Sequence, residues 1–97
     1  MDGILLREDA DGNLAAQLQN TTTSGNDGDG IDLDENSSGN LDVLIKKGTS
    51  SNNVLAGVRA DQASPSTGAL SLVTFTATGN GAGAIVANAR VTVTQMP

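Results

Sequence analysis

The chain has 97 residues, a formal net charge of −6, no cysteine or histidine, and a single aromatic residue, Phe75. This charge argues against binding to nucleic acid, whose phosphates need a basic surface, and against anionic membrane surfaces. No apolar run approaches the roughly 18 residues that would cross a bilayer. Leu, Ile, Val and Phe together make up less than a quarter of the chain, a thin supply for an ordinary compact globule.

A short pattern returns along the chain with a period of 27, at Gly3-Ile4, Gly30-Ile31, Gly57-Val58 and Ala84-Ile85. Such a period predicts stacked coils, in which each coil buries small side chains against the same positions of its neighbours. We therefore predict one all-β solenoid domain. Its coils are expected at residues 2–27, 28–54 and 55–81, with a partial coil or cap at 82–97 that closes the stack.

The first strand of each coil is predicted at residues 3–7, 30–34, 57–61 and 84–88. Alternation along these strands predicts two inward ladders, which consist of Ile4, Ile31, Val58 and Ile85 and of Leu6, Leu33, Ala60 and Ala87. On the outer face, Arg7 is expected to pair with Asp34, and Asp32 with Arg59. A polar loop follows the strand, and it is longer in the third coil, at residues 62–68.

The second strand is predicted at residues 14–18 and 41–45, with Leu70 and Leu72 on the same wall. The third is predicted at 20–24, 47–51 and 74–78, after a corner near residues 19, 46 and 73. There Thr21, Gly48 and Phe75 are expected to point inward in one stack. Hydroxyl side chains should then form outward rows, which consist of Thr22, Thr49 and Thr76 beside Ser24, Ser51 and Thr78.

Asn26, Asn53 and Asn80 keep the same interval, and each precedes a Gly/Ala-Ile/Val step. Identical amides about 4.8 Å apart can form a hydrogen-bonded ladder, and Asn tolerates the left-handed backbone of a sharp bend. With these features, residues 2–89 resemble the right-handed parallel β-helix repeat family of pectin-degrading enzymes, phage tailspikes and bacterial surface proteins. The spacing gives about 3.5 coils, and the resemblance implies an extracellular or cell-envelope location.

A second resemblance is weaker and covers less of the chain. Residues 68–95 look like the closing strands of a cohesin-type β-sandwich, which would be an immunoglobulin-like fold with a role in protein–protein interaction. This alternative leaves the spacing of residues 2–58 unexplained.

Three kinds of site are considered. The acidic run suggests calcium bound by Asp27, Asp29, Asp32 and Asp34, although a turn and a solvated strand face explain the same residues. The outward hydroxyl rows resemble those of β-solenoid ice-binding proteins, and exposed strands also favour Thr and Ser. Paired carboxylates at Asp32 and Asp34, or at Asp34 and Asp61, with Arg59 nearby, are the nearest approach to acid–base catalysis.

No catalytic residues and no cofactor are predicted, because eleven acidic residues bring carboxylates together by chance. We expect a structural or passive binding module, such as a spacer or stalk, which is a fragment of a longer protein. The alternative is a glycan-binding or polysaccharide-acting module. The uncapped edge at residues 3–6 predicts self-association through a coil end or contact with flanking coils.

Overall fold

Strands form wherever apolar and polar residues alternate, and turns form at the Gly- and Asn-rich segments between them. The computed structural model describes all 97 residues, contains no helix, and has nine strands. Their bounds are β1 Ile4–Glu8, β2 Leu14–Gln19, β3 Thr22–Ser24, β4 Ile31–Glu35, β5 Leu41–Ser51, β6 Ala56–Gln62, β7 Gly68–Thr78, β8 Gly83–Ala87 and β9 Val91–Met96. It therefore offers no helix that could cross a membrane.

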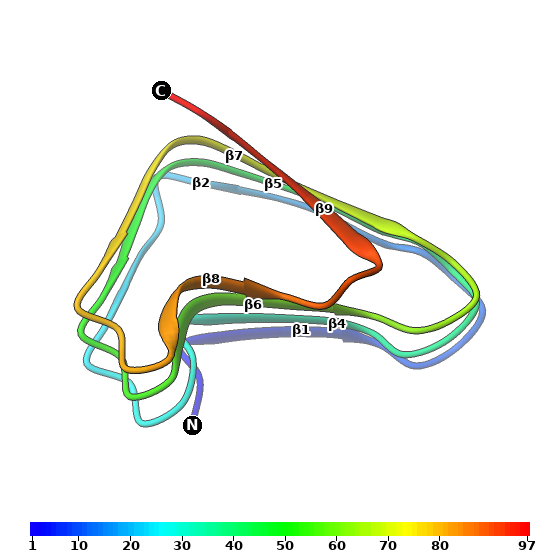
Figure 1. The fold of residues 1–97 in the computed structure, drawn as a ribbon, viewed down its shortest axis with the longest axis horizontal. Helices are drawn as coiled ribbons and strands as arrows, with labels where there is room; N and C mark the ends of the chain where they lie inside the picture. The colour runs from blue at the N-terminus through cyan, green and yellow to red at the C-terminus, as the bar shows by residue number, and fades with distance from the viewer.

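The strands stack in two parallel sheets, in the orders β1-β4-β6-β8 and β2-β5-β7-β9, and β3 also pairs with β5. Partners such as Ile4 and Ile31, or Leu14 and Leu41, occupy equivalent positions of successive coils. Viewed down the stack, these coils superpose on one another (Figure 1). The predicted β-solenoid is confirmed, with about three turns. The cohesin-like sandwich is wrong, because residues 68–95 form parallel strands of different coils.

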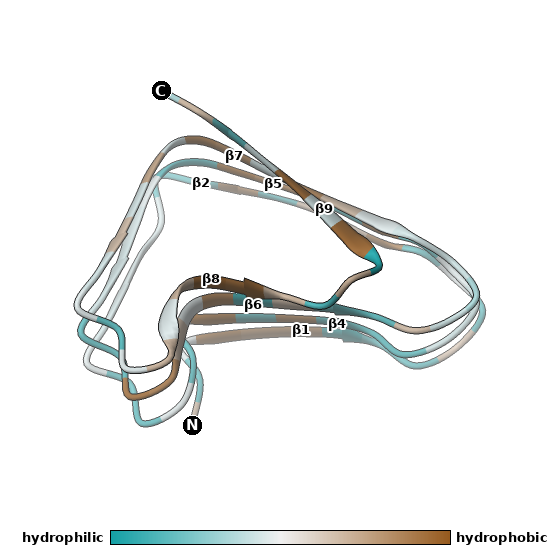
Figure 2. Cartoon of the chain, viewed as in Figure 1, coloured by the Kyte–Doolittle hydropathy of each residue, from teal (hydrophilic) through white to brown (hydrophobic).

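The core lies between the two sheets and consists of the inward ladders of the first strands and of the apolar wall of the second strands. Nine buried apolar residues form it, namely Ile31, Leu33, Leu41, Val43, Ile45, Val58, Ala60, Leu70 and Leu72. Corresponding residues of the end coils, such as Ile4 and Ile85, are only partly buried because no coil covers them. The loops that join the sheets at the right of Figure 2 are largely hydrophilic.

The corner before the third strand uses left-handed backbone at residues other than glycine. Asn20, Lys47 and Thr74 have φ values of 57°, 57° and 53°, so the corner recurs in three coils, one residue after its predicted place. This reversal turns Gly48 inward beneath Phe75, with which it pairs. An added Cβ on Gly48 would lie 2.5 Å from the Thr21 carbonyl oxygen, so only glycine fits there.

The last coil takes a shorter path. β9 pairs Val91 with Gly68, a closer spacing than in the earlier coils, because Asn88–Arg90 replaces their polar loop. The strand then crosses the end of the stack (Figure 1). The C-terminal end consequently presents β8 and β9, and it has no fourth copy of the third strand over Thr74–Thr78.

Candidate functional site

The asparagine ladder is the most extensive polar feature inside the solenoid. Asn26 Nδ2 donates to Asn53 Oδ1 at 2.8 Å, and Asn53 Nδ2 donates to Asn80 Oδ1 at 2.8 Å. The same Oδ1 atoms also accept the backbone N–H groups of Asn26 and Asn53. The predicted ladder is confirmed, but the left-handed residues are those just before the ladder, Gly25, Asn52 and Gly79.

Ser50 connects this ladder to the third strand. Its buried Oγ accepts from Thr23 Oγ1 at 2.8 Å and from Asn53 Nδ2 at 3.1 Å, and it donates to the Gly57 carbonyl at 2.8 Å. Every hydrogen-bonding valence of this hydroxyl is in use, so Ser50 has no free lone pair or proton for chemistry.

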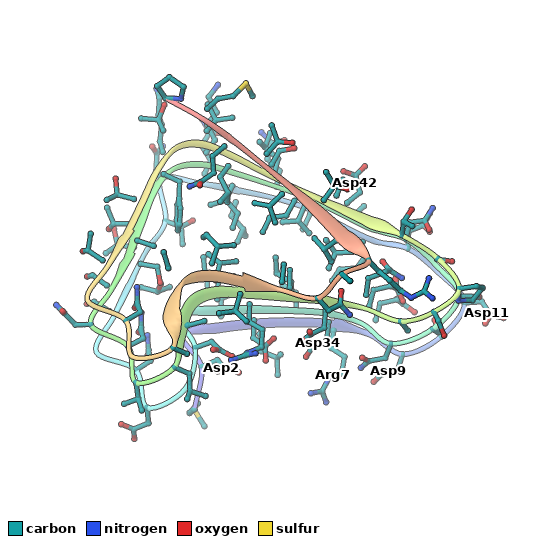
Figure 3. The ribbon with its side chains drawn as sticks, in the orientation of Figure 1. Asp2, Arg7, Asp9, Asp11, Asp34 and Asp42 are labelled. Carbon is teal, nitrogen blue, oxygen red and sulfur yellow. The ribbon has the colours of Figure 1, made fainter.

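Five aspartates gather on the outer face of β1, β4 and β6 and in the turns before them. Carboxylate oxygens of Asp2, Asp29 and Asp32 lie within 4.8 Å of one another, as do those of Asp32, Asp34 and Asp61. Asp2 and Asp34 project from this outer face, together with Arg7 (Figure 3). Asp32 belongs to both groups, because register places it between Leu5 and Arg59 in the middle of the face.

The ion pairs on this face differ in part from the prediction. Arg7 lies 3.7 Å from Asp34, as predicted. Arg59 does not pair with Asp32, because its Nε donates instead to Asp29 Oδ2 at 3.1 Å. The Asp29 side chain is only 4% exposed and its other oxygen accepts from the Ala56 N–H, so it offers Arg59 a better-desolvated partner.

Asp32 is left without a cation. One of its oxygens is buried and has no hydrogen-bond partner. Burial first, and then the neighbouring carboxylate of Asp34, raise the pKa of Asp32 to about 7. Burial and Asp34 also raise the pKa of Asp61, against the opposing charge of Arg59. This face therefore holds a proton near neutral pH more readily than ordinary carboxylates do.

These groups define where a divalent cation would be held. Of the residues considered for calcium, Asp29, Asp32 and Asp34 lie in the two clusters, but no cluster includes the exposed Asp27. Each cluster supplies three carboxylates, whereas Ca²⁺ takes 6–8 oxygen ligands, so water would have to complete the shell. Asp29 is held by Arg59 at 3.1 Å and by a backbone N–H, whereas Asp34 makes only a looser ion pair with Arg7 at 3.7 Å, so Asp32, Asp34 and Asp61 are the better set.

The carboxylate pairs considered for acid–base catalysis lie on an open strand face. Asp34 and Asp61 are neighbours across β4 and β6, and Asp34 faces Arg7. Arg59, the basic residue nearest Asp32 in the sequence-based hypothesis, is occupied by Asp29. The pair lies on a strand surface and lines neither of the two grooves of the molecule.

Two polar ladders were missed by the sequence analysis. Asp2 and Asp29, at equivalent positions of the first two coils, cap the N–H groups of Asp29 and Ala56 in turn. Glu8, Glu35 and Gln62 form a second series with the same spacing. Glu35 is completely buried, and its Oε1 has no partner. The repeated Asp-Gly-Ile triplet and the constant interval between repeats could have revealed both.

The outward hydroxyl rows border a shallow groove on the third-strand face. The rows pair in register, Thr22 with Thr49 and Thr49 with Thr76, and Ser24, Ser51 and Thr78 lie beside them. A cavity of about 400 Å³ follows the rows and is lined entirely by polar residues and glycine, namely Asn20, Thr22, Lys47, Gly48, Thr49, Thr74 and Thr76. The corner residues with left-handed backbone form one wall of it.

A second groove of about 390 Å³ lies along the first residues of β5, β7 and β9, beside Asp42, Thr67 and Thr92. Two of its lining residues are apolar, and it contains one acidic and no basic side chain. Its lining residues do not point to a particular class of ligand.

Comparison with known proteins gives no relative from which a site can be transferred. No protein-family model, no curated protein and no solved structure matches the chain.

Proposed function

We propose that this chain is a structural repeat module, a rigid spacer or stalk segment of an extracellular or cell-envelope protein. The observation that carries the proposal is that most of its interior polar side chains form hydrogen bonds that hold one coil to the next. The amides of Asn53 and Asn80, the Ser50 hydroxyl and the Asp29 carboxylate each bond to another coil or to the polar network between coils.

The extracellular or envelope setting rests on the resemblance to the β-helix repeat family. The parent sequence on either side of the chain tests it. A secretion signal or an envelope anchor would support the setting, whereas a flanking domain of cytoplasmic metabolism would contradict it.

The spacer role predicts that coils can be added without loss of structure. A variant with residues 28–54 duplicated directly after residue 54 should lengthen along the stack by about 4.8 Å. It should also unfold at higher denaturant concentration, because each coil adds an interface. Small-angle scattering and urea unfolding measure both, and a Gly/Ser insertion of equal length at the same site is the control. Loss of β-structure in the duplicated variant would contradict the proposal.

The second candidate is a glycan-binding module, and the third-strand groove is the observation that favours it. Hydroxyl, amide and ammonium groups line this groove, and sugars hydrogen-bond to such groups. A carbohydrate array tests the idea, with Thr49→Val in the groove and Thr92→Val outside it as a matched pair. Binding that Thr49→Val abolishes and Thr92→Val retains would support it, and an array without binding would refute it.

A further inference from the structure

We infer that copies of this chain associate head to tail, with the N-terminal coil of one copy against the C-terminal end of the next. The inference rests on the proposed structural role and names its partner, a second copy of the same chain. Three features carry it: open edges of both sheets, equivalent ladder positions in the first strands of the two ends, and a charge gradient along the stack.

Within residues 1–97, both sheets end in strands that are paired on one side only. β1 and β2 lie at the N-terminal end of the stack, and β8 and β9 lie at the other. The Ile4 N–H donates to the Gly30 carbonyl, which lies on the β4 side of β1. Because alternate residues of a parallel strand face opposite neighbours, Leu5 and Arg7 direct their N–H and C=O groups to the open edge. Such edges pair readily with other strands.

The first strands of the two ends lie in the same register of one sheet. Ile4 and Ile85 occupy equivalent ladder positions, as do Leu6 and Ala87. These end residues are only partly buried, whereas Ile31 and Val58 between them are fully buried. A copy stacked in the same direction would continue both ladders and cover these apolar side chains.

The distribution of charge along the stack favours head-to-tail over head-to-head contact. Residues 1–27 contain five acidic residues and one arginine, a net charge of −4. Residues 28–54 contain five acids and two lysines, and residues 55–81 contain one of each sign. Residues 82–97 contain one charged side chain, that of Arg90, and have a net charge of +1.

A contact between two N-terminal ends would place two charges of −4 within a Debye length of about 8 Å. A head-to-tail contact instead places the acidic end against the basic one. It also keeps strand pairing parallel, as within the chain. This contact is heterologous and leaves both outer ends free, so it generates an open series rather than a closed dimer.

The contact between copies involves the faces formed by the first and second strands of the coils, and not the face formed by the third strands. The third-strand ladder stops at Thr74–Thr78, one coil short of β8 and β9. A second copy therefore meets the stack through β8 and β9 alone, and the inferred association is reversible and dependent on concentration.

Sedimentation velocity over a concentration series tests the inference on the full chain. Leu5→Pro removes an edge donor without touching the bonds to β4 and should weaken association by about tenfold or more. Leu5→Ala, which keeps that N–H, is its control. Arg90→Glu should weaken association by about threefold to tenfold at low salt, and the effect should vanish at about 1 M salt. Arg90→Lys preserves the charge and is its control.

Species larger than a dimer, growing with concentration and reduced by both variants, would support head-to-tail stacking. A monomer at all concentrations, or a dimer that does not grow, would overturn it, as would association indifferent to both variants. If Leu5→Pro fails to fold, the salt-dependent effect of Arg90→Glu decides. A monomer that still lengthens when a coil is duplicated would overturn this inference and leave the spacer role standing.

Discussion

The central rung of the asparagine ladder offers the sharpest test of how the coils are held together. In Asn53→Leu the amide is replaced by an apolar group of similar size at a site only 2% exposed. The change removes four hydrogen bonds, two accepted by Oδ1 from Asn26 and two donated by Nδ2 to Asn80 and Ser50.

The magnitude follows from the groups left behind. Four bonds at a net value of about 1 kcal/mol each amount to about 4 kcal/mol. The Asn80 Oδ1 atom keeps the Asn53 N–H, and Ser50 keeps two partners, so only the donors of Asn26 are orphaned. Burial of the leucine side chain returns about 1–2 kcal/mol. The free energy of unfolding should therefore fall by about 3 kcal/mol.

Urea unfolding monitored by circular dichroism measures this loss. At about 4–8 °C per kcal/mol, the thermal midpoint should fall by about 12–24 °C. Asn26→Leu is the matched control, because this end residue donates a single side-chain bond and should cost about 1 kcal/mol. Equal losses in the two variants would refute the ladder as the connection between coils.

Three further predictions concern single sites. Because folding raises the pKa of Asp32 from 3.8 to about 7, its ionisation destabilises the fold increasingly from pH 4 to pH 7. Stability should therefore rise by about 1–2 kcal/mol when the pH falls from 8 to 5, after allowance for solvent screening, and Asp32→Asn should flatten this slope in urea titrations. Glu35→Gln should stabilise the protein by about 1 kcal/mol in the same assay at pH 7, because it removes a buried carboxylate with an unpartnered oxygen. Gly48→Ala should lower the free energy of unfolding by about 2–3 kcal/mol, because its Cβ would meet a backbone oxygen at 2.5 Å.

Each of these has a control on the same chain. Asp42→Asn, far from the aspartate cluster (Figure 3), should leave the pH slope unchanged. Glu8→Gln, in the half-buried first rung, should change stability less than Glu35→Gln. Gly12→Ala meets its nearest atom at 3.7 Å and should be close to neutral. A Gly48→Ala variant as stable as Gly12→Ala would show that the close approach of the coils at Gly48 does not constrain the fold.

Much of the architecture could be predicted because equal spacing along the chain becomes equal position in space when coils stack. The constant interval between repeats and the alternation of period two placed Ile4, Ile31, Val58 and Ile85 in one ladder, and the structure has this register. The same logic placed Gly48 under Phe75 and the hydroxyl rows on the outer face.

The pairing of charged and polar side chains could not be predicted in the same way. Register set Asp32 beside Arg59, yet the Arg59 guanidinium binds Asp29, because the Asp29 carboxylate is almost completely buried and is the better-desolvated partner. Spacing likewise did not show that Asn88–Arg90 would shorten the last loop and bring Val91 onto Gly68.

The sequence by itself determined the coil length, the inward ladders and the asparagine rungs, since these depend only on backbone repetition and on identical residues at identical intervals. The tertiary structure alone decided which carboxylates meet, which oxygens remain unpartnered and which faces of the stack stay open. Those outcomes depend on side-chain reach, on burial and on the path of the corners, all of which are set by several coils at once and by no single repeat.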